Sequence, residues 1–251
     1  MNTNHIKRVL IVGGSSGIGY AIANILSQRE ECEKIYIVDK NPLPMDFRCD
    51  KCEFFQENLA LSDFSLFDGF KDINALVITA GFGQLALFED VSQQYISDSF
   101  LVNSVAPVRI VHKFYDKLKS DADFYCGIMV SIAGFLSSPF FAVYGATKAA
   151  LKIFIESVNV ELEKGGSQNR ILNVSPGSIP GTSFNNGKND LSLSLPLAGE
   201  IIAHMERKDD LFIPQYDEIF HQVLERYHDD FRSEGRHSYD YKLKSGRVKN
   251  N

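Results

Sequence analysis

The stretch VLIVGGSSGIG, which begins at Val9, constrains the fold more than any other part of the chain. An apolar run is followed by glycines at Gly13, Gly17 and Gly19. Because glycine has no Cβ, this spacing is typical of a backbone that turns sharply and approaches another molecule closely. Between a strand and a helix, such a turn directs free N–H groups and the positive helix end at one point, which suits a pyrophosphate.

Asp39 ends the next apolar run, twenty residues after Gly19. A carboxylate at this place can accept both hydroxyl protons of an adenosine ribose. The glycine spacing is not the G-x-G-x-x-G of the standard dinucleotide fingerprint, and alone it could mark a tight structural turn. The strand context together with Asp39 favours dinucleotide binding.

Short apolar runs alternate with helix-like stretches along the whole chain. The runs are continuous rather than alternating, as expected for strands buried on both faces: RVLIV, KIYIVD, EFFQENL, ALVITAG, GIMVSIAG and RILNVSPG. Helical patterns cover about 18–29, 92–119, 144–163 and 197–207. This alternation predicts an α/β fold, a doubly wound parallel sheet flanked by helices. The irregular stretch from Gly177 to Pro196 predicts a mobile substrate lid.

Composition limits the class of protein. At 251 residues and 44% hydrophobic content, the chain can bury the core of one large domain, which we assign to residues 1–231. Residues 232–251 are basic, and we expect them to form a flexible, solvated terminus. The formal net charge of -6 argues against general affinity for nucleic acid. No apolar run is long enough for a signal peptide or a membrane span, so we expect a cytoplasmic protein without a membrane partner.

Four cysteines, two of them in the sequence CDKC at Cys49 and Cys52, raise the question of metal or redox chemistry. A structural zinc site usually needs a second Cys or His pair at similar spacing, and the chain has none. We therefore expect no metal, and reduced thiols at Cys32, Cys49, Cys52 and Cys126.

A second group of residues carries chemistry. Tyr144 and Lys148 in YGATKAA are four apart on an expected helix, so their side chains lie on one face. A neighbouring ammonium stabilises a phenolate, which predicts a Tyr144 pKa lowered toward neutrality and suited to proton transfer. Ser131, thirteen residues earlier, ends another strand at the same edge of the sheet as the glycine turn.

With these motifs in this order, the sequence resembles the short-chain dehydrogenase/reductase family from Val9 to about Pro214. The resemblance implies a Rossmann-type fold and catalytic residues at Asn103, Ser131, Tyr144 and Lys148. It implies cofactor-binding residues at Gly13, Ser15, Ser16, Gly17, Ile18, Gly19, Asp39, Asn58, Leu59, Ala80, Gly81, Tyr144, Lys148, Pro176, Gly177, Ile179 and Thr182. Val12 and Thr79 replace a Thr and an Asn of the family, so two internal hydrogen bonds are expected to be missing. Thr182 stands one residue later than the family's usual Thr.

The resemblance implies an NAD(P)-dependent oxidoreductase that interconverts a carbonyl and a secondary alcohol. Tyr144 would exchange the proton, Ser131 would bind the same oxygen, Lys148 would hold the nicotinamide ribose, and Asn103 would support a water leading to solvent. NAD(H) is expected over NADP(H), because a 2′-phosphate would meet the Asp39 carboxylate and only Lys40 lies near to soften the preference. Aromatic residues lie just ahead of Tyr144, and Phe184 lies in the expected lid. They fit an apolar pocket wall or contacts in the core or the dimer, so whether the substrate is apolar is left open.

The C-terminal sequence differs from family members that form tetramers through a terminal strand. We therefore expect a homodimer through the helices that carry Asn103 and Tyr144. A non-catalytic dinucleotide sensor or scaffold on the same fold remains the alternative, since a fold alone does not fix activity. A sugar-nucleotide epimerase fits poorly, because those chains carry a larger C-terminal domain. The substrate and the direction of the reaction are left open.

Overall fold

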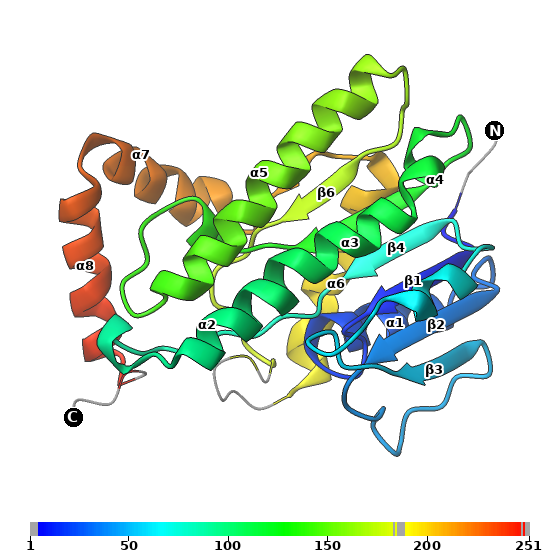
Figure 1. Ribbon diagram of the computed structural model, residues 1–251, viewed down its shortest axis with the longest axis horizontal. Coiled ribbons are helices and arrows are strands. Elements are labelled where there is room, and N and C mark those ends of the chain that lie inside the picture. The colour runs from blue at the N-terminus through cyan, green and yellow to red at the C-terminus, as the bar shows by residue number, and fades with distance from the viewer. Residues whose placement is uncertain (1–4, 183, 185–188, 247, 249–251) are drawn as a thin grey trace.

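The computed structural model describes residues 5–182, 184, 189–246 and 248. Seven parallel strands form one sheet in the order β3-β2-β1-β4-β5-β6-β7 (Figure 1). The strands are β1 (Arg8–Val12), β2 (Lys34–Asp39), β3 (Cys52–Gln56), β4 (Ala75–Ile78), β5 (Tyr125–Met129), β6 (Ile171–Val174) and β7 (Leu211–Phe212). The predicted Rossmann-type, doubly wound parallel sheet in a single domain is confirmed.

Helices cover both faces of the sheet. One face carries α1 (Gly17–Ser27) and α6 (Leu191–Arg207), and the other carries α3 (Ala106–Lys113), α4 (Tyr115–Lys119) and α5 (Ala142–Lys164), with α2 (Gln93–Phe100) leading into α3. The helices α7 (His221–Asp229) and α8 (Phe231–Lys244) stand beyond the carboxyl ends of the strands (Figure 1). Among the residues described, no helix combines the length and apolar composition needed to cross a membrane.

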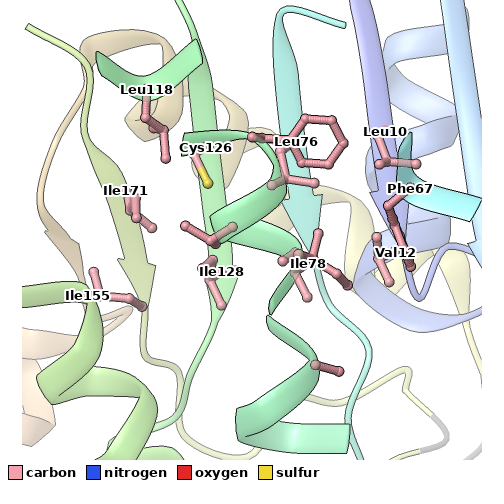
Figure 2. Packing of buried hydrophobic residues seen from close by; sticks show 14 of the residues in the cluster. Leu10, Val12, Phe67, Leu76, Ile78, Leu118, Cys126, Ile128, Ile155 and Ile171 are labelled. Carbon is pink, nitrogen blue, oxygen red and sulfur yellow. The ribbon is translucent and has the colours of Figure 1, made fainter. Parts of the chain in front are cut away.

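The strands β1 to β6 supply both cores, because their side chains alternate between the two faces. In β1, Leu10 and Val12 pack on the side of α3 and α5, whereas Val9 and Ile11 pack on the side of α1 and α6. All four are at most 1% exposed. Figure 2 shows the first of these cores, in which strand residues such as Leu76 lie among the covering side chains.

The strand order reverses between β1 and β4. From β1 the chain moves outward to β2 and β3, and then returns to β4 on the other side of β1. At such a switch point the two connecting loops diverge, which opens a crevice at the carboxyl ends of the strands. The glycine-rich turn after β1 therefore lies at this crevice.

The helix expected over 92–119 is broken. A π-helical turn, Leu101–Val105, separates α2 from α3, and Phe114 separates α3 from α4. Pro107 explains the first break, since it has no N–H to donate to the carbonyl of Asn103, one turn earlier. The break places Asn103 in a local widening of the helix, where it is fully buried.

Two C-terminal expectations are corrected. α6 begins at Leu191, with the Asp190 carboxylate accepting a hydrogen bond from the Ser192 N–H, so the irregular segment ends earlier than Pro196. Residues 183 and 185–188 of the predicted lid lie outside the described residues. The basic tail is not solvated throughout. Most of it forms the helix α8, in which Glu234 and Lys242 are buried.

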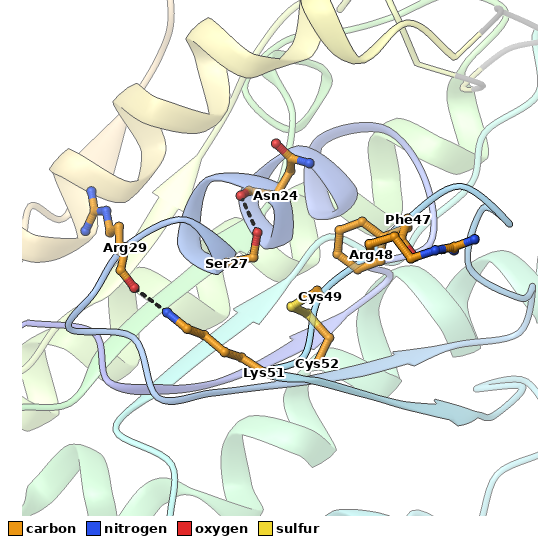
Figure 3. The surroundings of a disulfide bond; sticks show 8 residues. All are labelled: Asn24, Ser27, Arg29, Phe47, Arg48, Cys49, Lys51 and Cys52. Carbon is orange, nitrogen blue, oxygen red and sulfur yellow. Dashed lines mark hydrogen bonds between the residues drawn. A yellow bond between two sulfur atoms is a disulfide. The ribbon is translucent and has the colours of Figure 1, made fainter.

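Cys49 and Cys52 form a disulfide in the loop that leads into β3 (Figure 3). The expectation of reduced thiols is therefore wrong for this pair, while Cys32 and Cys126 are free and buried. A turn brings the pair together: the Cys52 N–H donates to the Cys49 carbonyl at 3.1 Å, and the two Cα atoms are 5.3 Å apart, a usual disulfide separation. Within the described ranges, no three His, Cys, Asp or Glu side chains are grouped to hold a metal.

Candidate active site

The glycine-rich turn is shaped by close backbone contacts. Gly13 has a φ of +93°, and a Cβ on it would lie 2.3 Å from the Ala80 nitrogen after β4. A Cβ on Gly19 would lie 2.3 Å from the carbonyl oxygen of Gly13. Any larger residue at these two positions would push apart the loops that follow β1 and β4, which are the two walls of the switch point.

Thr79 ties the same loops together. Its hydroxyl donates to the Gly13 carbonyl at 2.9 Å and lies 3.3 Å from the Val12 carbonyl. Thr79 in place of the family's Asn therefore does not leave this position without an internal hydrogen bond, because the hydroxyl supplies a donor.

Asp39 is fixed against the turn. One of its carboxylate oxygens accepts from the Ser15 N–H at 3.0 Å, and the other accepts from the Asn41 N–H at 3.0 Å. The carboxylate therefore stands at the mouth of the glycine turn with its position set by two backbone donors. Lys40 is exposed beside it.

A large cleft of about 2190 Å³ runs along the carboxyl ends of the strands. That volume exceeds the usual few hundred to 1,000 Å³ of a pocket for one drug-sized ligand, so the cleft has room for a dinucleotide and a substrate. Most of the site residues expected from the sequence line it: Gly13, Ser16, Ile18, Gly19, Asp39, Asn58, Leu59, Ala80, Gly81, Ser131, Tyr144, Pro176, Gly177, Ile179 and Thr182. Ser15, Gly17, Asn103 and Lys148 are not among the residues that line it.

Ser131 and Tyr144 meet at the centre of the cleft. The Ser131 hydroxyl lies just after β5, accepts from the Ala133 N–H at 3.1 Å, donates to the Pro176 carbonyl at 3.4 Å and lies near enough to the Tyr144 hydroxyl to act on its pKa. Tyr144 lies in the first turn of α5 and is 8% exposed. Its ring is 5.2 Å from that of Phe141 and 5.2 Å from that of Phe184, measured between centroids.

Lys148 lies one turn further along α5. Its Nζ donates to the Met129 carbonyl at 2.8 Å and stands 5.7 Å from the centroid of the Tyr144 ring. A Cβ on Gly81 would be 3.5 Å from this Nζ, so the ammonium lies directly behind the loop that follows β4.

The Asn103 side chain hydrogen-bonds both the loop after β4 and the helix α5. Its amide nitrogen donates to the Phe82 carbonyl at 2.9 Å and to the Thr147 hydroxyl at 3.2 Å, and its amide oxygen accepts from the Phe82 N–H at 3.0 Å. The side chain thus joins the loop after β4 to α5. These contacts occupy both of its N–H groups.

Burial sets the protonation of the central pair. It raises the pKa of Tyr144 to about 12, with the Ser131 hydrogen bond acting in the opposite sense. Burial also lowers the pKa of Lys148 to about 7. The expected depression of the Tyr144 pKa is therefore not produced by the protein's own atoms, because desolvation penalises both the phenolate and the ammonium that would stabilise it.

The far wall of the cleft was missed by the sequence analysis. Phe220 packs so closely on the turn after β6 that a Cβ on Gly177 would lie 2.6 Å from its ring. α8 contributes His237, Tyr239 and Lys242 to the lining. The polar residues of α8 predicted a solvated terminus. Its aromatic residues, which lie among the charged ones, were the local signal that one side of this helix is buried.

Thr182 lies against the glycine turn. A Cβ on Gly17 would lie 3.4–3.5 Å from the Thr182 side chain, so Thr182 covers the glycine turn. Its hydroxyl donates to the Ile179 carbonyl at 3.1 Å. Thr182 thus lies over the turn that suits a pyrophosphate, whereas Phe184, two residues later, lies against the ring of Tyr144.

Comparisons with known proteins agree with this geometry. Residues 63–191, just over half of the chain, match the family model described as short chain dehydrogenase. The uncharacterized oxidoreductase TDA5 of Saccharomyces cerevisiae is 28% identical over 232 residues, covering 86% of this chain and 71% of the relative. The short-chain dehydrogenase virD of Hypocrea virens is 30% identical over 225 residues, covering 82% of this chain and 74% of the relative.

Solved structures show the same fold. A short chain dehydrogenase/reductase from Burkholderia phymatum in complex with NAD has a TM-score of 0.74 at 17% identity, covering 92% of this chain and 96% of that one. A short-chain dehydrogenase from Sphingobium yanoikuyae in complex with NADPH has a TM-score of 0.70 at 19% identity, covering 90% and 96%. With the matching family model and a relative of 30% identity, these findings show that this chain is an oxidoreductase of the short-chain dehydrogenase/reductase family.

Proposed function

We propose that this NAD(P)-dependent oxidoreductase interconverts a carbonyl compound and a secondary alcohol by hydride transfer, with Tyr144 as the acid or base. The observation that carries the proposal is that the Ser131 and Tyr144 hydroxyls are neighbours and both line the cleft. Two hydroxyls that converge in this way can bind one substrate oxygen while one of them exchanges its proton.

A nicotinamide dinucleotide fits the other half of the cleft. The absence of a Cβ at Gly13 and Gly19 permits a tight turn into α1, and the first N–H groups of that helix would bind the pyrophosphate. Asp39 would hold the adenosine ribose, Asn58 and Leu59 the adenine, and Ala80, Gly81, Pro176, Gly177 and Ile179 the nicotinamide half. When bound, the cofactor supplies or accepts the hydride. The two similar structures named above hold NAD and NADPH, respectively.

The protein's own groups favour a proton donor at Tyr144. With its pKa raised to about 12, the hydroxyl is protonated at neutral pH and can protonate the alkoxide that forms during reduction. Ser131 would donate to the same oxygen. Lys148, whose pKa of about 7 leaves it partly charged at neutral pH, would bind the nicotinamide ribose and add positive charge beside Tyr144.

Asn103 would act through its main chain. Both N–H groups of its side chain are engaged by Phe82 and Thr147. Pro107 has no N–H to donate to the main-chain carbonyl of Asn103. We therefore assign to that carbonyl the support of a water that relays protons.

We expect the assembly to be a homodimer through α2, α3 and α5. Exposed apolar side chains gather on α2, on the π-helical turn that joins it to α3 and on α5: Phe100, Leu101, Val105, Ile153 and Val160. Sedimentation equilibrium should give twice the chain mass, and Ile153→Asp together with Val160→Asp should yield a folded monomer. A wild-type monomer at micromolar concentration would contradict the assignment of this face.

Tyr144→Phe should lower kcat by about 10²–10⁴-fold, the usual contribution of a positioned acid or base. A panel of ketones and secondary alcohols, followed by NADH absorbance, first identifies the best substrate. The Kd for NADH should change less than about twofold, since the ring remains. Tyr115→Phe, in α4, is the matched control and should leave kcat unchanged. Near-normal turnover of Tyr144→Phe would reject Tyr144 as acid or base, and a wild type that binds NADH but never turns over would favour the sensor alternative.

Lys148→Met should stabilise the fold at neutral pH. The pKa of Lys148 is about 7 in the fold against its usual 10.5, so the unfolded chain binds more protons between these values and wild-type stability rises with pH across that window. The penalty is complete below pH 7, and methionine removes it. Urea unfolding should show the variant's advantage shrinking toward pH 10.5. Lys164→Met, at the exposed end of α5, should show no such trend, and a parallel pH dependence in Lys148→Met and wild type would refute the burial argument.

NADH should bind about tenfold more tightly than NADPH. At about 4 Å and an effective dielectric near 20, Asp39 and each charge of a 2′-phosphate repel by roughly 4 kcal/mol, and a third of that is about tenfold in affinity. Fluorescence titration measures both constants. Asp39→Ser should bring the two within about threefold, whereas Asp98→Ser, at the other end of the cleft, should leave the ratio unchanged. Equal binding of both cofactors by the wild type would mean that Lys40 governs the choice.

A further inference from the structure

The segment Ser138–Phe141, directly before α5, contains a strained residue. Phe140 has a φ of +66°, in the left-handed region that bulky side chains avoid. Its ring is nevertheless buried, at 5% exposure, and its carbonyl accepts from the Ala86 N–H at 3.0 Å. A residue in this conformation persists only where surrounding contacts hold it there.

Those contacts come from α8. The Nζ of Lys242 donates to the Ser138 hydroxyl at 2.7 Å and to the Pro139 carbonyl at 2.8 Å. The Tyr239 ring stacks on the Phe140 ring at a centroid distance of 4.5 Å. Lys242 is only 9% exposed, so its desolvated ammonium depends on these oxygen partners.

The same lysine reaches the wall of the active site. Its Nζ lies 5.4 Å from the centroid of the Phe141 ring, and that ring is 5.2 Å from the ring of Tyr144. Phe141 is also the N-cap residue of α5, with no side-chain hydrogen bond to fix the helix start. Contacts therefore run without a gap from α8, through Ser138–Phe141, to the tyrosine at the centre of the cleft.

The helix pair is itself anchored as a unit. Arg226 of α7 donates through Nε to the Glu234 carboxylate at 2.7 Å, and Glu234 is 7% exposed. α8 therefore contacts α7 through Glu234 and contacts the segment Ser138–Phe141 through Lys242. A loop fixed to such a unit keeps one arrangement, whereas a loop with only solvent beside it would relax the φ of Phe140.

We propose that Lys242 is a positioning residue for the reaction: it clamps Ser138–Phe141 to α8 and thereby sets the place of Phe141 and of the Tyr144 hydroxyl on the substrate side of the cleft. It touches neither the reacting atoms nor the cofactor half, so its loss should affect turnover and leave cofactor binding intact. A displacement of about 1 Å in a catalytic group can cost about 100-fold in rate. This inference rests on the proposed function for its kinetic readout alone.

Three variants of the full chain test the clamp. Lys242→Met removes the donors and keeps the length, Lys242→Arg keeps donors and charge, and Lys244→Met is the matched control on the exposed side of α8. Hydrogen exchange followed by mass spectrometry reports on residues 136–147 without any substrate. NADH titration and steady-state kinetics on the best compound of the ketone and alcohol panel supply the other readouts.

Lys242→Met should speed exchange in 136–147 and leave exchange in β1 and β2 unchanged. Its kcat should fall at least about tenfold, with the Kd for NADH within about twofold of wild type. Lys242→Arg should restore most of the kcat, and Lys244→Met should match wild type in every readout.

Unchanged exchange or unchanged kcat in Lys242→Met would overturn the proposal, and so would an equal loss in Lys244→Met or loss of NADH binding together with kcat. If wild-type protein turns over none of the compounds, the proposed function fails, and the exchange of 136–147 in Lys242→Met still decides whether the clamp exists.

Discussion

The close approach of two backbones at the switch point is the constraint on which the rest of the structure depends. Gly13 meets the chain at Ala80 with no room for a Cβ, and the Thr79 hydroxyl closes the contact on Gly13. This contact holds together the loops that follow β1 and β4, where the strand order reverses. Every other part of the cleft is placed relative to it, from Asp39 on one side to Asn103, which ties the loop after β4 to α5.

Desolvation then decides what the site can do. The same dry surroundings that raise the pKa of Tyr144 lower that of Lys148, so the two groups tend toward neutrality together. A neutral pair needs little internal charge compensation, which fits a cavity lined by Phe141 and Phe184. Bound cofactor and substrate can then supply the charge that proton and hydride transfer require.

The sequence was sufficient for the sheet and the central residues, because buried parallel strands leave continuous apolar runs and the glycine turn has few other uses. It was insufficient where structure depends on partners distant in sequence. Lys242 meets Ser138, 104 residues away, and no local pattern records that contact. The oxidation state of Cys49 and Cys52 does not follow from their spacing. Pro107 did carry the signal for the break at Asn103, but it was read as part of one long helix. The pKa of Tyr144 depends on burial, which spacing on a helix does not reveal.

The position of α8 in the chain has a consequence for biosynthesis. The sheet through β6 and the helix that bears Tyr144 are made before α8, and about 70 residues separate the end of β6 from the end of α8. At roughly 5–20 residues per second, the ribosome needs on the order of 4–14 s to produce them. For that interval a nascent chain holds a nearly complete sheet whose aromatic wall faces water. The nascent chain therefore passes through a stage in which apolar side chains of the cleft are exposed to water. Chaperones that bind exposed apolar surface would recognise it at that stage.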